Sequence, residues 1–297
     1  MATGPVNLLD VSKDEFRDFL DSFDHIFSDC DGVIWSNTPL DGSGEFFKLM
    51  KKHGKTVHYV SNNSIRSKEN YEAKFKASGI TDGYENLTVP SVAMAEYLKS
   101  LNFNKTVYCV TNPQTIKTLE SYGFKCKSGP DVGTSFYAEY VQYLNDDEEI
   151  GAVVFDSDFQ ANLPKMYKAI TYLRRPEVIF LNGATDRHIV FKPGFLGLGT
   201  QVFTDLAIEE TKRLPIQLGK PGKLFGEFAM RRADLSDPSR ILFIGDMIEQ
   251  DVGLGKQTGF KTLLVLTSHT TEEMLNHKTI QPDFYAPSLG SIVPLLN

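Results

Sequence analysis

The sequence has few cysteines and no long hydrophobic run. Its 297 residues include three cysteines, Cys30, Cys109 and Cys126, and none of them belongs to a CxxC pair. An odd number without that spacing predicts neither a disulfide framework nor a zinc site, and it favours a reducing compartment. No run approaches the ~20 apolar residues of a membrane span, and the first ten residues lack the features of a signal peptide. We therefore expect a cytoplasmic protein.

Clusters of basic residues are also missing. Lys and Arg total 31 against 38 Asp and Glu, which gives a net charge of −7. Without a basic patch to follow a phosphate backbone, we expect no nucleic-acid partner, and without a hydrophobic run we expect no membrane partner. What is present, 41% hydrophobic and 23% charged residues, is typical of a globular enzyme with one large domain or two medium ones.

Strands and helices alternate along most of the chain. Short apolar runs predict strands at 25–30, 56–60, 106–110, 152–155, 177–181, 216–218, 240–244 and 262–266. Helical periodicity and end signals predict helices at 12–22, 45–53, 68–78, 90–101, 113–122, 163–173, 198–212, 224–232 and 250–258. This alternation predicts a mostly parallel sheet, whose ligand site lies beyond the carboxyl ends of its strands.

The alternation starts afresh near residue 103, which predicts a second α/β unit inserted into the first. We expect a Rossmann-like, three-layer α/β core made of residues 1–102 and 208–297. Residues 103–207 would form an inserted α/β cap domain.

Polar residues follow several of the predicted core strands. The segments are Asp29-Cys30-Asp31-Gly32-Val33, Ser61-Asn62-Asn63, Gly219-Lys220-Pro221, and Gly245-Asp246 with Asp251. Each is weak evidence alone, because a lone DxDG is most often a surface turn. A calcium loop would place Val33 and Leu40 at ligand positions, and a nucleotide P-loop would need Ser or Thr after Lys220. Their joint order after predicted strands favours one phosphoryl-transfer site.

The four segments resemble the motifs of the haloacid dehalogenase superfamily of phosphohydrolases, in the same order. The fuller strings at 29–35, 61–64 and 219–221 look like the group that contains phosphoglycolate phosphatase, pyridoxal phosphatase (chronophin) and 4-nitrophenylphosphatase. The resemblance covers nearly the whole chain, and its core motifs are very specific. It implies a phosphatase with a large cap, which is often a homodimer through that cap.

The residue types suit hydrolysis of a phosphate monoester through an aspartyl phosphate. Asp29 can attack phosphorus, and Asp31 can protonate the leaving oxygen and then activate water. Asp29 and Asp246 offer the hard oxygen ligands that suit Mg²⁺. The resemblance adds the backbone carbonyl of Asp31 as a third ligand and Asp251 as a residue that contacts the metal through water.

Three further residues are candidates for binding the phosphate group. The Ser61 hydroxyl and the Asn62 amide would donate hydrogen bonds to phosphate oxygens, and Lys220 would add a compact positive charge that screens Asp29.

The resemblance places a substrate-reading loop at 182–188, where Asp186, Arg187 and His188 are candidate specificity residues. Arg187 and His188 could equally be solvated loop residues. The segment at 188–199 is shorter than in the vertebrate-type phosphatases of this group, and Gln250 stands where relatives usually carry threonine. The substrate therefore stays open between phosphoglycolate, pyridoxal phosphate and similar metabolites, with p-nitrophenyl phosphate in vitro.

Other functions are possible on the same fold. A phosphotransferase or mutase would pass the phosphoryl group to a second substrate, and a protein phosphatase would act on a phosphorylated side chain. A catalytically idle binding protein is a further alternative, but the intact set of motifs argues against it.

Overall fold

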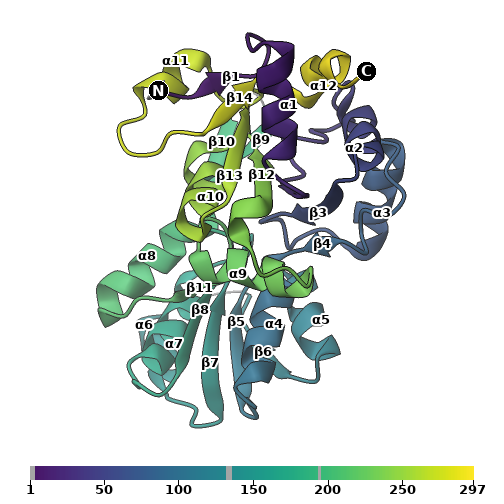
Figure 1. The fold of residues 1–297 in the computed structure, drawn as a ribbon. Helices are drawn as coiled ribbons and strands as arrows, with labels where there is room; N and C mark the ends of the chain where they lie inside the picture. Colours follow the sequence, from purple (N-terminus) through teal and green to yellow (C-terminus); the bar gives the residue numbers. More distant parts are fainter. Residues whose placement is uncertain (1–3, 132–135, 193–194) are drawn as a thin grey trace. The chain divides into compact units, whose positions relative to one another are not determined.

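The computed structural model describes residues 4–131, 136–192 and 195–297, and the chain divides into two compact units (Figure 1). Unit 1 comprises residues 1–61, 67–88 and 220–297, and unit 2 comprises residues 62–66 and 89–219. Each unit contains a parallel sheet with helices, which confirms the predicted α/β class.

Unit 1 is built on a seven-stranded sheet in which every neighbouring pair of described strands is parallel. The strands, in order across the sheet, are β1 (Val6–Asn7), β14 (Phe284–Ala286), β13 (Lys261–Val265), β12 (Ile241–Gly245), β2 (His25–Ser28), β3 (Thr56–Val60) and β4 (Leu87–Thr88). All five residues of β12 are buried. Because successive residues of a strand face opposite sides of the sheet, both faces are covered, as in a three-layer fold.

Five helices of unit 1 lie close to predicted positions, whereas those at 271–276 and 289–292 were not predicted from the sequence. The helices of unit 1 are α1 (Lys13–Asp21), α2 (Ser43–Lys52), α3 (Lys68–Ala77), α9 (Lys223–Arg232), α10 (Gly253–Thr258), α11 (Thr271–Asn276) and α12 (Leu289–Ile292), with 3₁₀ turns η2 (Pro238–Arg240) and η4 (Val293–Leu296) and a π-helical turn η3 (Ile248–Val252). At the start of α1, Ser12 and Glu15 cap each other's backbone N–H groups. This reciprocal pair is a capping box, which the spacing of the two residues in the sequence allows.

Unit 2 contains a five-stranded parallel sheet and an antiparallel hairpin. The sheet strands, in order, are β11 (Ile216–Gln217), β8 (Ile179–Asn182), β7 (Ile150–Phe155), β5 (Thr106–Val110) and β6 (Lys125–Ser128), and the hairpin pairs β9 (His188–Lys192) with β10 (Phe195–Leu198). Its helices are α4 (Pro90–Ser100), α5 (Pro113–Ser121), α6 (Tyr137–Tyr140), α7 (Leu163–Leu173) and α8 (Thr200–Thr211), with the 3₁₀ turn η1 (Val141–Leu144).

Two elements that the sequence groups with the core belong to unit 2 by their contacts. Helix α4 packs on α5, and strand β11 pairs with β8 in the sheet of unit 2. The predicted boundaries at 102/103 and 207/208 therefore lie inside unit 2, which begins its main segment at Val89 and ends at Gly219. The local pattern shows that a strand forms at 216–218, but it does not show which sheet the strand joins.

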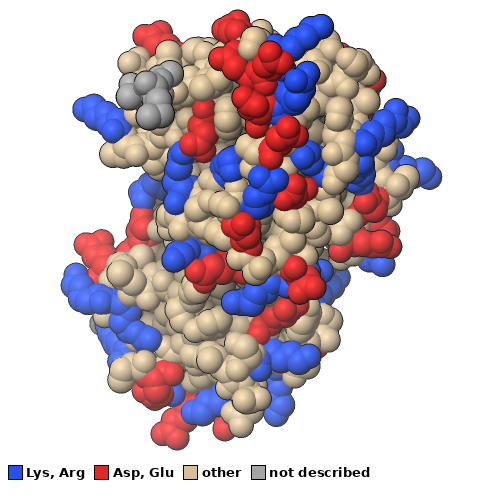
Figure 2. Space-filling view, viewed as in Figure 1, with Lys and Arg blue, Asp and Glu red and all other residues tan. Residues whose placement is uncertain are grey.

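Acidic and basic side chains are interspersed over the surface seen in Figure 2. This distribution agrees with the absence of basic clusters from the sequence. Within the described residues, no helix has both the length and the apolar character needed to cross a bilayer.

Candidate active site

Three buried aspartates of unit 1 lie together beyond the carboxyl ends of two central strands. Asp29 directly follows β2, Asp246 directly follows β12, and these two strands pair in parallel. Asp251 lies in the π-helical turn after β12. One oxygen from each of the three carboxylates lies within 4.8 Å of the others. The sheet thus gathers carboxylates that are far apart in the sequence, as its parallel topology predicts.

Lys220 supplies the positive charge inside this group. Its Nζ lies 2.8 Å from Asp29 Oδ2 and 2.7 Å from Asp251 Oδ1, and its side chain is 2% exposed. Burial disfavours the charged form of Lys220, but the two carboxylates outweigh burial and raise its pKa above the ordinary value. The lysine therefore stays protonated and fixes the orientation of both aspartates.

Burial also sets the protonation of the two strand-end aspartates. It raises the pKa of Asp29 well above the ordinary value; Lys220 opposes this shift, and the charges of Asp251 and Asp246 add to it. Burial, together with the charge of Asp251, raises the pKa of Asp246 to about 7. Crowded carboxylates are costly to ionise without a cation, which is a common property of metal and catalytic sites.

Glycine is required at two positions because the carboxylates come so close to the backbone. Gly32 has φ +76°, and a Cβ there would lie 2.1 Å from Asp246 Oδ2. A Cβ at Gly245 would lie 2.2 Å from Asp251 Cγ. Any side chain at these positions would displace an aspartate, so the two motif glycines serve the geometry of the site.

The hydrogen bonds leave one carboxylate oxygen open. Asp251 uses both oxygens: Oδ2 accepts from the backbone N–H groups of Asp246 (3.0 Å) and Met247 (2.9 Å), and Oδ1 pairs with Lys220. Asp246 Oδ2 accepts from the Ser268 hydroxyl, but its Oδ1 is buried without a hydrogen-bond partner among the described residues. An orphaned carboxylate oxygen beside another carboxylate fits a divalent cation, so the residues present suit such a metal.

Comparisons with known proteins agree with this geometry. A family model described as haloacid dehalogenase-like hydrolase matches residues 26–125, and a second model of HAD-like hydrolases matches residues 217–292. Phosphoglycolate phosphatase 2 of Arabidopsis thaliana is 32% identical over 96% of this chain and 97% of its own length. The chain belongs to the haloacid dehalogenase-like hydrolases. Within this family it is an enzyme of the phosphatase class.

Two other relatives extend the comparison. The 4-nitrophenylphosphatase of Schizosaccharomyces pombe is 30% identical over 95% of this chain and 97% of its own. The structure of a p-nitrophenyl phosphatase from Archaeoglobus fulgidus aligns with a TM-score of 0.78 at 26% identity, covering 92% of this chain and 99% of that one. The match over nearly the full length shows that the two-unit organisation belongs to this group of HAD hydrolases.

The other motif residues of unit 1 lie at the same end of the sheet. Asp31 is half-buried, and its Oδ1 accepts a hydrogen bond from Trp35 Nε1 at 3.1 Å. Ser61 directly follows β3, the neighbour of β2, and its hydroxyl accepts from Tyr71 Oη at 3.4 Å. The structure thus brings Asp29, Asp31, Ser61, Lys220, Asp246 and Asp251 to the carboxyl edge of one sheet.

The remaining candidate residues belong to unit 2, whereas the aspartate cluster belongs to unit 1. Asn62 begins the short segment of residues 62–66, and Asp186 precedes the hairpin. Arg187 forms an exposed ion pair with Asp205 of α8, and His188 is the exposed first residue of β9. Phosphate binding by Asn62 and substrate reading by the other three stay predictions.

Sequence reasoning missed two hydroxyl residues of the site. Ser268 donates to Asp246, and Thr267 Oγ1 donates to the backbone carbonyl of Gly32 at 2.5 Å. Both follow β13, the strand that pairs with β12. A serine and a threonine just beyond a central strand carry no recognised motif, so only their position after a predicted strand could have indicated them.

Proposed function

We propose that this HAD phosphatase hydrolyses small phosphorylated metabolites with Mg²⁺, through an aspartyl phosphate on Asp29. The observation that carries the proposal is the arrangement of Asp29, which is buried, paired with Lys220 and has a carboxylate oxygen within 4.8 Å of one from Asp246, a residue whose Oδ1 has no hydrogen-bond partner among the described residues. A carboxylate held in this way is oriented to act as a nucleophile, and its surroundings can neutralise an incoming phosphate dianion.

The first chemical step moves the phosphoryl group from the substrate to Asp29. A carboxylate oxygen of Asp29 forms a bond to phosphorus while the bond between phosphorus and the leaving oxygen breaks. Asp31 gives its proton to that oxygen, and the alcohol is released. Lys220 offsets the negative charge that gathers on the phosphoryl oxygens, together with hydrogen bonds from Ser61 and Asn62.

The second step returns Asp29 to its starting state. Asp31 is now ionised and can take a proton from a water molecule that attacks phosphorus. The bond between phosphorus and Asp29 breaks, and inorganic phosphate leaves. Paired catalytic carboxylates often differ in this way: the buried Asp29 acts as the nucleophile, and the half-buried Asp31 acts as the acid and base.

Asp29, Asp246 and the backbone carbonyl of Asp31 would hold the magnesium ion. When bound, the ion cancels the repulsion between Asp29 and the phosphate group and stabilises charge on the phosphoryl oxygens. Asp251, which accepts from two backbone N–H groups and pairs with Lys220, would position the site and contact the ion through water.

Phosphoglycolate is the first substrate to test, because it gives its name to the Arabidopsis relative. Pyridoxal phosphate and p-nitrophenyl phosphate follow. In unit 2 the loop that ends at Arg187 and His188 would read the part of the substrate away from phosphorus. The homodimer and the cytoplasmic location expected from the sequence stay proposals.

A panel of these phosphates, assayed with and without Mg²⁺, tests the activity. We expect turnover that chelation abolishes and Mg²⁺ restores. In Asp31→Asn, mass spectrometry should detect phosphate on Asp29, because attack can proceed slowly while the base for hydrolysis is lost. Turnover that survives thorough chelation would refute the metal role, and transfer of labelled phosphate to an alcohol instead of water would favour a phosphotransferase.

Arg187→Ala tests the proposed substrate reading. It should raise KM for phosphoglycolate by about tenfold and leave KM for p-nitrophenyl phosphate nearly unchanged, because one lost ion pair is worth ~1.4 kcal/mol in this context. Asp205→Ala is the matched control, since it removes the partner of Arg187 but keeps the cation. Equal effects of Arg187→Ala on both substrates would place substrate reading elsewhere in unit 2.

A further inference from the structure

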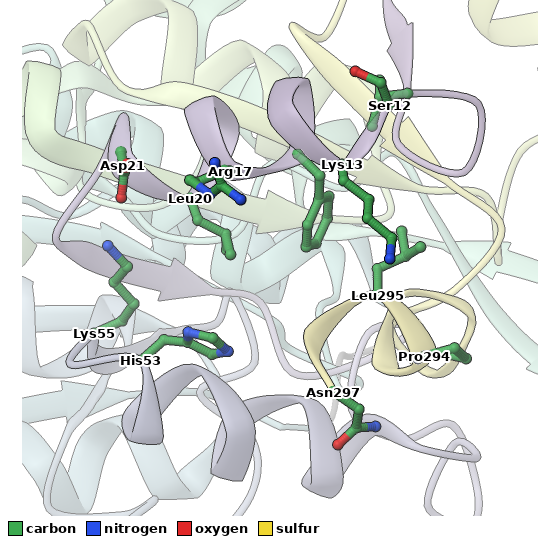
Figure 3. A pocket seen from close by; sticks show the side chains of 12 residues that line it. Ser12, Lys13, Arg17, Leu20, Asp21, His53, Lys55, Pro294, Leu295 and Asn297 are labelled. Atoms are coloured by element: carbon green, nitrogen blue, oxygen red, sulfur yellow. The ribbon is translucent and has the colours of Figure 1, made fainter.

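A cavity of about 520 Å³ lies in unit 1 between helix α1, the chain after α2, and the turn η4 (Figure 3). Phe16, Leu20 and Leu295 supply apolar wall, and Lys13, Arg17 and Lys55 supply positive charge. None of the aspartates of the active site lines it. Its volume is in the range of cavities that bind small organic molecules.

Helix α1 presents one face to this cavity. Its lining residues Lys13, Phe16, Arg17 and Leu20 stand at positions i, i+3, i+4 and i+7, which form one stripe of a helix. The stripe contains two cations and two apolar side chains. Most acidic residues of the helix lie off the stripe, at Asp14, Glu15 and Asp18. The helix thus separates its charges by sign and directs the positive ones to the cavity.

The charge of the lining contrasts with that of the chain. Lys13, Arg17 and Lys55 give three positive charges against one negative charge from Asp21, a balance of +2 with His53 neutral, whereas the whole chain carries −7. Lys55 Nζ donates to the backbone carbonyl of Phe23 at 2.8 Å, which holds it at one end of the cavity.

Arg17 is the cation best placed to bind an anion. It pairs with Asp14 at 3.2 Å, but the two side chains are 70% and 88% exposed. An ion pair so exposed contributes little stability, so a ligand can compete for the guanidinium at small cost. The planar guanidinium suits a carboxylate, which it can bind through two parallel hydrogen bonds.

The apolar side chains that line the cavity indicate that the rest of the ligand is apolar. Phe16 is 6% exposed and forms part of the core, whereas Leu295 is 39% exposed. Water against such side chains makes few hydrogen bonds, so an apolar group gains free energy by displacing it. We propose that this cavity binds an organic carboxylate with an apolar body, whose carboxylate meets Lys13 and Arg17 while its body covers Phe16, Leu20 and Leu295.

Calorimetric titration of the intact protein with decanoate tests the proposal. Decanoate should bind saturably with one molecule per chain, and decyltrimethylammonium, which has the same chain but a positive head, should not bind. Arg17→Glu should weaken decanoate binding at least about tenfold, since it replaces an attraction by a repulsion. Arg231→Glu is the matched control, because Arg231 is an exposed helix residue of unit 1 outside the cavity. It should leave the affinity unchanged.

A second variant addresses the apolar wall and guards against misfolding. Leu295→Ser should weaken decanoate binding, while circular dichroism and turnover of p-nitrophenyl phosphate stay at wild-type values. If Arg17→Glu does not fold, Lys13→Gln takes its place. The proposal is overturned if decanoate binds folded Arg17→Glu and Leu295→Ser as it binds the wild type, or if the cationic amphiphile binds equally well. It is also overturned if decanoate does not bind and Arg17→Glu instead disrupts a dimer in sedimentation velocity, because a second copy would then be the occupant.

Discussion

Both units have buried aspartates directly after a central strand, but the surroundings of these aspartates differ. Asp29 and Asp246 of unit 1 and Asp156 of unit 2 each directly follow a central strand of a parallel sheet, and all three are buried. Asp156 belongs to no cluster of three or more metal-ligating side chains among the described residues, and hydrogen bonds from the groups around it satisfy its oxygens. Its oxygens accept from Thr115 Oγ1 at 3.0 Å, from the backbone of Ser157 at 2.9 Å and from the backbone of Ala184 at 3.3 Å.

The unit 1 aspartates differ in two respects. They stand with Asp251 in a crowd of like charges around Lys220, and Asp246 keeps an oxygen that no described residue satisfies. Burial at a strand end therefore does not by itself mark a catalytic carboxylate. Crowded like charges and a carboxylate oxygen without a hydrogen-bond partner do mark one, because both are stabilised when a cation binds.

The largest expected effect is the difference in kcat between Asp29→Asn in unit 1 and Asp156→Asn in unit 2. Asp29→Asn should lower kcat by about 10³-fold or more, because it removes the nucleophile with almost no change in shape. Asp156→Asn should leave kcat within the same order of magnitude. Steady-state assays with p-nitrophenyl phosphate and circular dichroism on both variants check this. A severe loss in Asp156→Asn with the fold intact would break the distinction between the two regions.

The next largest expected difference between the two regions is the effect of their aspartates on Mg²⁺ affinity. Mg²⁺ must displace the proton of Asp246, whose pKa of about 7 lies far above that of an exposed aspartate. At a pH below that value affinity should fall by at least roughly tenfold per pH unit, because burial also raises the pKa of Asp29, the other carboxylate proposed to hold the ion. Calorimetric titrations across this range measure the slope. Asp246→Asn should abolish the binding and Asp156→Asn should not alter it, while a flat profile in the wild type would contradict the assignment.

The sequence predicted which motif segments of unit 1 lie together, because each of their signals is local. The segments that carry Asp29, Ser61 and Asp246 each follow an apolar run of strand length, and parallel topology then brings them together. The capping box of α1 is equally local. Contacts between distant segments were the part that sequence could not supply. Examples are the pairing of β11 with β8 and the hydrogen bond from Ser268 to Asp246.

The hydroxyl that sequence reasoning missed offers a smaller test. Ser268→Ala removes the donor to Asp246 Oδ2, so the carboxylate loses its fixed orientation. We expect Mg²⁺ affinity to fall about tenfold with little change in stability, since residues that support metal ligands have effects of about this size. Ser239→Ala is the matched control, because Ser239 Oγ also donates to an aspartate, Asp237, at 2.7 Å. If both variants bind Mg²⁺ as the wild type does, Ser268 does not position Asp246.

The smallest effect should appear in unit 2, in the stability that Asp156 contributes. Burial raises the pKa of Asp156, and its hydrogen bonds, including one with the Ser64 side chain, only partly offset this shift. The folded state therefore binds the proton more tightly than the unfolded state does. The stability that results is present below the unfolded pKa, about 3.9, and is lost as pH rises through the folded pKa.

Asp156→Asn removes this titration, since an amide keeps the shape and carries no proton to lose. The Tm of the variant relative to the wild type should therefore rise as pH passes through the folded pKa of Asp156 and then level off. Scanning calorimetry at a series of pH values provides the measurement. Asp237→Asn serves as an exposed control whose trend should run in the opposite direction, because hydrogen bonds from Ser239 lower the pKa of Asp237. A difference in Tm that does not vary with pH would contradict the raised pKa of Asp156, and the contrast with the unit 1 aspartates would then rest on their crowding and their open oxygen.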